Sequence, residues 1–401
     1  MMKMSFLKKT NIPQILFLIL VLSSCGKEKK ATESTTTAVE DTLPKMKPAG
    51  PEKRLSANYI NSLQGRINHF YNKNWPNNSM NGSFLVAKNG QIIFERYNGY
   101  ANKNEDTKIT ADTPVQIASV SKVLTATAVL KLVNAGKITL DQKVNTILKT
   151  FPYEDCTVRM LLSHRSGMRN YAYFTDHDKS VWDRHNQLTN KDILDILATK
   201  NVGLESKTGT RFGYCNTNYA MLALIIEKVT GLTYKEAMSQ MIFKPLGMKN
   251  TYVFDDDKDR KKIVPSYKGN GAEIGFDYLD NVYGDKNVFS TVRDLLKFDR
   301  ARNTAGFLKP ALLKEVYTGQ SNERKGTKNY GLGIRMINWE TGQNFYFHNG
   351  WWHGNTSSYI PLMKEHVTII ALSNKMTRNT YAVRKLAPIF GDYPFNFKDE
   401  E

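Results

Sequence analysis

The sequence predicts an α+β fold: one antiparallel sheet built from both chain ends, flanked by helices and interrupted by a mainly helical lobe over about residues 125–270. Three observations support this prediction. Strand-like apolar runs occur near both ends of the chain, helical periodicity fills the middle, and no internal repeat is present. With 401 residues, 41% of them hydrophobic and 23% charged, the chain can form one large core or two joined lobes, which excludes a disordered or collagenous protein.

The folded part is expected to run from about Leu55 to residue 393. From Leu55 to Asn72 apolar residues recur at the spacing of one helix face, which predicts an amphipathic first helix. Two apolar runs follow, at 83–87 and 91–96, and the residues between them include Asn89-Gly90. Asn-Gly between strand-like runs is a strong hairpin signal, so two antiparallel strands should follow the helix.

The middle of the chain, about 119–269, is mostly helical in pattern, and helices are expected to end at Gly136, Gly231 and Gly247. The carboxyl-terminal part returns to strand patterns, which predict a meander. Its strands are expected at 330–339, 344–348, 355–362 and 366–373. A helix over about 379–390 and a short tail at 394–401 complete the chain.

The amino terminus has the pattern of an export signal. Three lysines within the first nine residues precede an apolar stretch from Ile12 to Leu22, which is shorter than the roughly 20 residues that a membrane span needs. The run ends in Ser23-Ser24-Cys25, which resembles the lipobox of bacterial lipoproteins. Residues 1–24 are therefore expected to be a lipoprotein signal peptide that is removed before a lipidated Cys25; an ordinary secretory signal containing a cysteine is the alternative.

We therefore expect an exported protein, anchored to a bacterial membrane through Cys25 and facing the periplasm or the cell exterior. Residues 25–54 are rich in Lys, Glu, Thr and Pro and have almost no large apolar side chains, so we expect them to form a flexible tether.

The two remaining cysteines, Cys156 and Cys215, do not make a disulfide framework, and we expect two free thiols.

The net charge is strongly positive. The formal value of +18 becomes +15 when the three lysines of the signal peptide are removed. Such an excess is compatible with nucleic acid or with anionic cell-surface polymers. Export, the scatter of the basic residues and the lack of a nucleic-acid-binding motif argue against nucleic acid, so a solvated basic surface is the preferred interpretation.

The first candidate catalytic element is the pair Ser119 and Lys122. Residues three apart share a helix face, so the hydroxyl and the amine come within hydrogen-bond reach. The same spacing occurs twice near the amino terminus, so spacing alone does not select this pair. From Val120 to Leu130 the only charged residue is Lys122, and burial of this helix would favour a neutral amine that acts as a base. A lysine whose amine reaches water is the alternative.

Two further elements carry side chains suited to acyl transfer. Tyr214 and Asn216, two apart in an extended loop, can offer a phenol for proton transfer and an amide that holds a carbonyl. His348-Asn349-Gly350 follows a predicted strand, where the glycine allows close backbone approach and the histidine can stabilise negative charge or pass a proton. The alternatives are a loop tyrosine packed beside the next helix and a histidine satisfied by local hydrogen bonds.

Together, Ser-x-x-Lys at 119–122, Tyr-x-Asn at 214–216 and His-x-Gly at 348–350 resemble the family of class C beta-lactamases, D-alanyl-D-alanine carboxypeptidases and family VIII-type esterases. The motifs occur in the family's order, with similar separations of 95 and 134 residues. Residues 161–168 look like the family's LLTHTSG segment. Further family landmarks match at 225–231, 245–251 and 289–294. The resemblance covers about residues 83–375 and implies a beta-lactamase/transpeptidase-like fold.

The resemblance also implies roles for the matching residues. Ser119 would attack a carbonyl and form an acyl-enzyme, Lys122 and Tyr214 would manage the proton, and the backbone amides of Ser119 and Trp351 would form the oxyanion hole. The residues carried over are Ser119, Lys122, Tyr214 and His348 for catalysis, and Asn216, Gly350 and Trp351 for substrate binding. The substrate would be a small ester, amide or peptide. No metal or cofactor is implied.

One departure from the family pattern affects the prediction. Beta-lactamases of this class have lysine in the third motif, where it engages the substrate's carboxylate, and here His348 takes that place. The preferred function is therefore an esterase or a peptidase for D-amino-acid peptides. Lys207-Thr208-Gly209 also matches the KTG motif of beta-lactamases, but it precedes Tyr214, and this order excludes it as the third motif. The resemblance places His164 in a structural turn and implies no proton transfer by it. The alternative function is a non-catalytic, membrane-tethered binding or sensing module.

Overall fold

The computed structural model of the chain describes residues 43–50, 54–176, 179–323 and 326–395. The expected signal peptide, Cys25 and the first part of the expected tether lie outside the described residues, as does most of the expected tail. None of the described helices combines the length and the apolar character needed to cross a bilayer.

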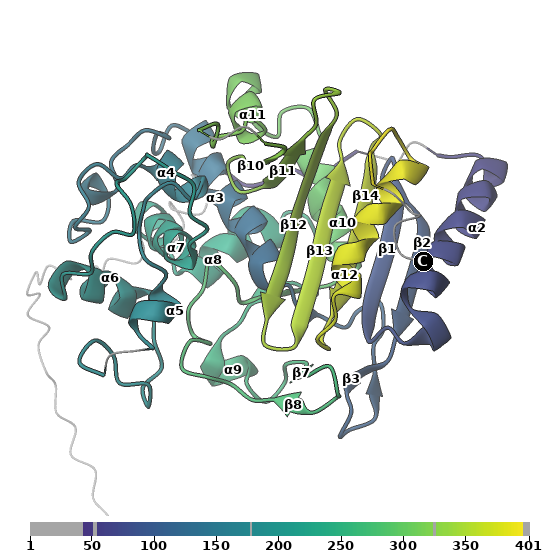
Figure 1. Ribbon diagram of the computed structural model, residues 1–401, viewed down its shortest axis with the longest axis horizontal. Helices are drawn as coiled ribbons and strands as arrows, with labels where there is room; N and C mark the ends of the chain where they lie inside the picture. Colours follow the sequence, from purple (N-terminus) through teal and green to yellow (C-terminus); the bar gives the residue numbers. More distant parts are fainter. Residues whose placement is uncertain (1–42, 51–53, 177–178, 324–325, 396–401) are drawn as a thin grey trace, which may run out of the picture.

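A seven-stranded antiparallel sheet forms the centre of the fold (Figure 1). Strands β1 (Gly82–Lys88) and β2 (Gln91–Asn98) come from the beginning of the domain. The other five strands come from its end: β10 (Lys328–Tyr330), β11 (Arg335–Asn338), β12 (Asn344–Trp352), β13 (Asn355–Leu362) and β14 (Val367–Ser373). Their order is β10-β11-β12-β13-β14-β1-β2, so the expected sheet from both chain ends is confirmed.

The opening helix and hairpin follow the sequence pattern. Helix α2 (Ala57–Asn74) is capped by Ser56, whose hydroxyl accepts a hydrogen bond from the Tyr59 amide. Asn89 and Gly90 form the turn between β1 and β2, with φ values of 53° and 84°. A two-residue hairpin turn needs these left-handed conformations, which asparagine and glycine adopt most easily.

The carboxyl-terminal strands differ from the expectation in two places. The segment expected as one strand at 330–339 lies in a hairpin of two short strands, β10 and β11, because a glycine-rich turn interrupts it. A Cβ atom on Gly333 in that turn would lie 2.2 Å from the Cβ of Ala126, so the turn packs too closely on the lobe for any side chain. The strand expected at 344–348 continues as β12 to Trp352.

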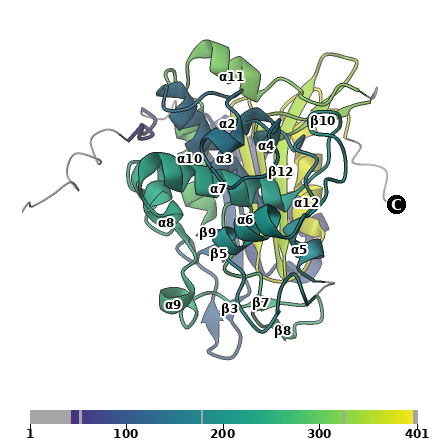
Figure 2. The ribbon, with the colours of Figure 1, turned by 90° about the vertical axis from the view of Figure 1, so that its left-hand side faces the viewer.

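The helical lobe lies between β2 and β10 in the sequence and to one side of the sheet (Figures 1 and 2). Its helices are α3 (Ser121–Asn134), α4 (Val158–Leu162), α5 (Tyr171–Phe174), α6 (Asn190–Thr199), α7 (Asn216–Thr230), α8 (Tyr234–Met238) and a π-helical turn (Ser239–Phe243). Helix α7 ends at Gly231 in a left-handed cap with φ of 71°, as predicted.

Smaller elements complete the domain. Helices α9 (Asp256–Asp259), α10 (Val292–Arg302) and α11 (Pro310–Val316) follow the lobe, and α12 (Asn379–Ala382) follows the sheet. A three-stranded sheet contains β5 (Val115–Gln116), β9 (Val288–Ser290) and β6 (Tyr252–Val253). Two hairpins contain β3 (Tyr100–Asn102) with β4 (Thr107–Lys108) and β7 (Ser266–Tyr267) with β8 (Glu273–Ile274).

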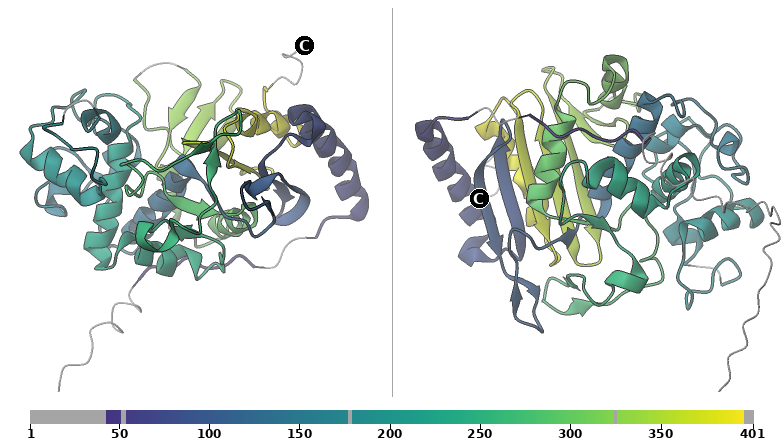
Figure 3. Two further views of the ribbon diagram at one scale, coloured as in Figure 1. Left: turned by 90° about the horizontal axis from the view of Figure 1, so that it is seen from below. Right: turned by 180° about the vertical axis from the view of Figure 1, so that it is seen from behind.

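Hydrophobic cores lie on both faces of the large sheet. Figures 1 and 3 show α2 and α12 on one side and α10 on the other. The core under α2 contains Phe70, Trp75 and Phe84. The other core joins the sheet to the lobe, and in it every residue of α3 from Ser121 to Leu132 is buried, as expected for a helix that is apolar almost all round.

Part of the expected tether packs against this second core. Leu43 and Met46 are buried, and the Met46 amide donates a hydrogen bond to the Met241 carbonyl at 2.7 Å. The prediction of a free tether over 25–54 is therefore wrong for residues 43–50. Two apolar side chains are enough to hold this short segment once a folded surface is present to receive them.

The start of the expected tail is packed as well. The Phe395 ring centre lies 4.9 Å from that of Phe345 and 5.3 Å from that of Trp339. The prediction of a tail at 394–401 is therefore wrong for this residue, because its apolar ring extends the core on the α2 side of the sheet.

Cys156 and Cys215 are buried free thiols, as predicted. Burial raises the pKa of Cys156 to about 12 and that of Cys215 to about 11. The thiolate is the reactive form of cysteine, so neither side chain is a nucleophile near neutral pH.

Candidate active site

Ser119 and Lys122 lie at the amino-terminal end of α3. Ser119 belongs to a 3-10 turn (Ala118–Val120) directly before the helix, and Ala118 has a left-handed φ of 46°, a strained conformation for a side chain with a Cβ atom. Lys122 Nζ lies 3.0 Å from Ser119 Oγ and donates to the Asp285 carbonyl oxygen at 2.8 Å. Lys122 is 0% exposed, so its amine does not reach water.

Strand β12 approaches Ser119 as closely as a backbone can. A Cβ atom on Gly350 would lie 2.9 Å from the Ser119 amide nitrogen and 2.5 Å from the Ile117 carbonyl oxygen, so only glycine fits. The Ser357 hydroxyl, on the neighbouring strand β13, donates to the same Ile117 oxygen at 2.6 Å. The next residue of β12, Trp351, is 55% exposed, which leaves its indole free to meet a substrate.

Tyr214 and Asn216 reach the same place from the start of α7. The Tyr214 ring centre lies 5.1 Å from Lys122 Nζ. Cys215, between them, points into the core, and Asn216 is the first residue of the helix. The Asn216 side-chain oxygen is buried and has no hydrogen-bond partner among the described residues, so it is an unused acceptor at the start of α7.

His348 lies beneath the site rather than in the cleft. It is fully buried; its Nδ1 lies 2.9 Å from the Asn349 carbonyl oxygen and its Nε2 lies 3.1 Å from the Tyr330 hydroxyl. A carbonyl only accepts, so Nδ1 carries the hydrogen and Nε2 accepts from the phenol. Burial, together with the charges of Arg335 and Lys122, holds the pKa of His348 well below its usual range.

His348 is therefore a neutral imidazole with both ring nitrogens occupied. This arrangement matches the alternative of a locally satisfied histidine more closely than that of a proton carrier. His348 lies two residues before Gly350 on β12, so it supports the strand that approaches Ser119.

The sequence analysis places His164 in a structural turn, and in the structure this turn contacts the loop that carries Tyr214. His164 has a left-handed φ of 57°, and its Nδ1 accepts hydrogen bonds from the Cys215 amide at 3.2 Å and the Asn218 side chain at 3.1 Å. Its ring centre lies 4.4 Å from that of Tyr214. Burial and the charge of Lys122 lower the pKa of His164, so a neutral ring supports the Tyr214 loop.

The KTG sequence at 207–209 belongs to this turn and not to the catalytic cleft. The Gly209 amide donates to the Arg165 carbonyl at 2.8 Å, and the Thr208 hydroxyl donates to the Ser166 carbonyl at 3.0 Å.

Arg335, on β11, was missed because nothing in the sequence separates it from the other scattered basic residues. Its guanidinium carbon lies 4.5 Å from the Tyr214 ring centre, and it forms no ion pair with any of the residues described. It borders a cavity of about 430 Å³. The other residues around that cavity are Arg211, Phe212, Ser321, Glu323, Lys328 and Asn329.

An antiparallel sheet beside a helical lobe, with a serine and a buried lysine at their junction, defines the class of penicillin-recognising serine hydrolases. A family model described as Beta-lactamase matches residues 78–390. The chain therefore belongs to the Beta-lactamase family, a family of serine hydrolases, as its motifs indicate.

Penicillin-binding protein 4* of Bacillus subtilis strain 168 is 29% identical to this chain over 318 residues, which cover 75% of this chain and 69% of that protein. Teichoic acid D-alanine hydrolase of Staphylococcus aureus strain MRSA252 is 25% identical over 316 residues, covering 73% and 75%. A crystal structure of a penicillin-binding protein from Bacillus halodurans shares the fold, with a TM-score of 0.69 at 23% identity, over 80% of this chain and 98% of that one.

Proposed function

We propose that this chain is a serine hydrolase that forms an acyl-enzyme at Ser119. The proposal rests on the 3.0 Å contact between Lys122 Nζ and Ser119 Oγ at the start of a buried helix. A buried amine beside a serine hydroxyl is a base placed to take the proton as Oγ attacks a carbonyl carbon.

The proposed reaction has two steps. In the first, the bond from Ser119 Oγ to the carbonyl carbon forms, Lys122 takes the hydroxyl proton, and the leaving group departs with a proton passed through Tyr214. In the second, water adds to the acyl ester, the bond to Oγ breaks, and the acid leaves. The backbone amides of Ser119 and Trp351 would stabilise the oxyanion in both steps, and Asn216 would hold the substrate's amide or ester group.

The proposed substrates are esters and D-amino-acid amides or peptides. Arg335 supports a leaving group with a carboxylate, because its guanidinium lies beside Tyr214 and has no ion pair among the described residues. It can hold that charge while the phenol delivers a proton. A terminal amino acid is such a leaving group. Its D configuration is inferred from relatives such as teichoic acid D-alanine hydrolase.

A dedicated beta-lactamase is less well supported. The third-motif side chain of such an enzyme has to reach the substrate's carboxylate, and both nitrogens of His348 are already bonded within the protein. A peptidase or esterase does not need that contact.

The experiment is a turnover screen of the purified protein against a D-Ala-D-Ala peptide, a p-nitrophenyl ester and nitrocefin. Ser119→Ala and Lys122→Met are each expected to lose at least about 10³-fold in kcat/KM, because nucleophile and base act as a unit. Ser121→Ala, a change to the next serine along the chain, should keep most of the activity. Labelling of Ser119→Ala by a fluorophosphonate at the wild-type level would disprove the assignment.

A further inference from the structure

Asp277, Asp280 and His353 form a group of possible metal ligands that takes no part in the proposed reaction. One ligand atom from each of the three side chains lies within 4.8 Å of the other two. The two aspartates belong to the loop that precedes β9, and His353 lies in the turn between β12 and β13. The fold therefore brings this Asp-Asp-His group together from two distant parts of the chain.

Two members of the Asp-Asp-His group are already as close as two ligands of one metal ion. His353 Nε2 lies 3.0 Å from Asp280 Oδ1 and 3.1 Å from Oδ2. Nitrogen and oxygen atoms that bind the same zinc ion at about 2.0–2.2 Å are separated by roughly 3.0–3.5 Å. The Trp352 indole donates to Asp280 Oδ1 at 2.7 Å and holds this carboxylate in place.

Asp277 is the member with unused acceptor capacity. Its side chain is half-buried and accepts a hydrogen bond from the Leu279 amide at 2.7 Å, and it forms no ion pair with a described residue. Burial and the charge of Asp280 raise the pKa of Asp277. Two carboxylates that repel each other in this way are stabilised when a cation binds between them.

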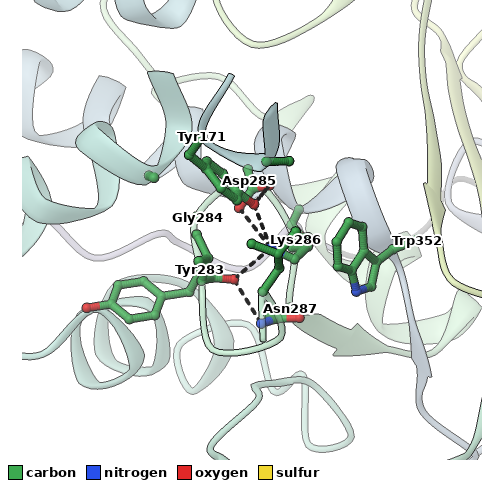
Figure 4. A network of polar contacts seen from close by, with 12 residues as sticks. Tyr171, Tyr283, Gly284, Asp285, Lys286, Asn287 and Trp352 are labelled. Carbon is green, nitrogen blue, oxygen red and sulfur yellow. Dashed lines mark hydrogen bonds and ion pairs between the residues drawn. The ribbon is translucent and has the colours of Figure 1, made fainter. Parts of the chain in front are cut away.

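Lys286 brings a positive charge close to the Asp-Asp-His group, but that charge already has a partner. Its Nζ forms an ion pair with Asp285 Oδ1 at 3.8 Å and donates to the Tyr171 hydroxyl at 2.6 Å. Trp352, whose ring centre lies 4.5 Å from Nζ, lies on the other side of the amine (Figure 4). The charge of Lys286 is therefore balanced by Asp285, which leaves the two carboxylates of the group to another cation.

The remaining charges match a divalent ion. Arg260 acts on Asp280 through its charge, but its guanidinium forms an ion pair with Asp256. Among the described residues, the ion pair of Asp280 is with His353, and neither carboxylate of the group pairs with a lysine or an arginine. With a neutral imidazole, the group carries two negative charges in a largely buried place, and one divalent cation balances them.

Asn355 provides a second, independent indication of a ligand. This residue is 5% exposed, and its side-chain oxygen has no hydrogen-bond partner among the described residues. It pairs across the hairpin with Trp352, so the two side chains lie on the same face. Asn355, Asp280 and His353 all line one cavity of about 190 Å³. A buried oxygen without a partner is costly, and a cation in this cavity would satisfy it.

We infer that Asp277, Asp280 and His353 form a binding site for a divalent transition-metal ion, with the Asn355 oxygen as a further ligand, and that Zn²⁺ fits this set of ligands. An imidazole nitrogen suits Zn²⁺, whereas Ca²⁺ and Mg²⁺ take oxygen ligands. The inference concerns a site apart from Ser119 and does not depend on the proposed function.

A bound ion would replace one hydrogen bond and join two elements. In the metal-free protein His353 Nε2 donates to Asp280, so binding releases that hydrogen and leaves the nitrogen lone pair to the ion. The ion would then fasten the loop before β9 to the end of β12. The same loop contacts Lys122 through the Asp285 carbonyl, and β12 approaches Ser119, so the site would stabilise the junction that holds the nucleophile.

The test is isothermal titration calorimetry with Zn²⁺ on the full chain after dialysis against EDTA. The wild type should bind one ion at this site. Asp277→Asn and His353→Gln should each weaken the binding by at least about 10-fold, because even changes to the partners of metal ligands have effects of that size. Zn²⁺ should also raise the melting temperature of the wild type more than that of either variant.

His185→Gln is the matched control. His185 Nδ1 lies 2.8 Å from Asp183 Oδ1, so this pair has the same chemistry as His353 and Asp280. It is exposed, and no third metal-ligating side chain joins it among the described residues. The variant should keep the wild-type affinity for Zn²⁺.

Three results would overturn the inference. They are a wild type that does not bind Zn²⁺, binding that is unchanged in folded Asp277→Asn and His353→Gln, and binding of Ca²⁺ as tight as that of Zn²⁺ and unaffected by His353→Gln. If His353→Gln does not fold, Asp277→Asn decides, because the Asp277 carboxylate contacts only a backbone amide. Labelling of Ser119 by a fluorophosphonate is measured separately, so a failure of the proposed function would not be mistaken for a failure of this site.

Discussion

Lys122 and His348 are both fully buried in one site, and their polar atoms are used differently. The nitrogens of His348 are bonded to Asn349 and Tyr330, which hold the ring still and uncharged. The amine of Lys122 points at the hydroxyl of Ser119, where a proton can be transferred. Both side chains are equally buried, but the neighbours of His348 make it a support for the strand, whereas the contact with Ser119 makes Lys122 the base of the proposed reaction.

Arg335→Gln tests the recognition of a carboxylate at the scale of one residue. The variant should raise KM for substrates whose leaving group carries a carboxylate by about 10- to 100-fold, because a charge-assisted hydrogen bond contributes roughly 1.5–3 kcal/mol. Uncharged esters should be affected little. Arg293→Gln is the control, since Arg293 is paired with Glu95. An equal loss on both kinds of substrate would contradict the role.

At the level of secondary structure, the candidate site lies where two helices begin beside one strand of the sheet. The start of α3, the start of α7 and strand β12 each contribute a residue or pair, and close contacts at Gly350 and Gly333 fix how they meet. The segment at 43–50 packs on the same core as α3. Its burial is therefore part of the stability of the lobe that carries Ser119.

Met46→Ala tests whether this segment belongs to the folded unit. Met46 is 3% exposed, so the change should lower the free energy of unfolding by about 2–5 kcal/mol, as the loss of a large buried side chain does. Urea denaturation of the intact chain measures this. Met376→Ala is the control because Met376 is 40% exposed, and it should shift stability by no more than about 0.5 kcal/mol. Equal stability of the two variants would show that the segment is not packed.

At the scale of the whole molecule, the buried histidines determine how stability depends on pH. The pKa values of His164 and His348 are lowered by burial, so below the usual value of 6.5 the unfolded chain binds protons that the folded chain does not. His353 is the opposite case: burial opposes its charge, but the hydrogen bond and charge of Asp280 raise its pKa. The contribution of His353 to the free energy of unfolding is complete below pH 6.5 and is lost as the pH rises through the pKa of His353 in the folded protein.

The free energy of unfolding should therefore be largest near pH 6.5. On the acid side it should fall by up to about 1.4 kcal/mol per pH unit for each of the two lowered histidines. Urea denaturation between pH 5 and 8 measures the profile. In His353→Gln the decline on the alkaline side should disappear while the acid side remains. A flat profile in the wild type would contradict this account.

We also propose, from the sequence, that the protein is exported and anchored to a bacterial membrane through a lipid on Cys25. The mature Cys25→Ala protein should partition into the aqueous phase of a detergent extraction, whereas the wild type should enter the detergent phase, because an acyl chain adds about 0.8 kcal/mol of membrane affinity per buried CH₂ group. Cys156→Ala is the control, since Cys156 is buried in the domain. Equal partitioning of wild type and Cys25→Ala would exclude the anchor.

The α+β class, the sheet built from both chain ends and the motif at 119–122 could be predicted from the amino-acid sequence alone. These features are local: periodicity describes one element at a time, and Ser119 and Lys122 share one turn of chain. Each of the three motifs spans only a few consecutive residues, so all three can be found in the sequence. Their order along the chain then indicated the family.

The tertiary structure was needed to see what surrounds Lys122, Arg335 and His348. Each depends on residues far away in the chain: the carbonyl that holds Lys122 belongs to Asp285, 163 positions later, and the partner of His348 is Tyr330 on another strand. Sequence spacing does not report which distant side chains meet, or how many charges share one buried space. Those contacts, and not the motifs alone, determine what surrounds the proposed base.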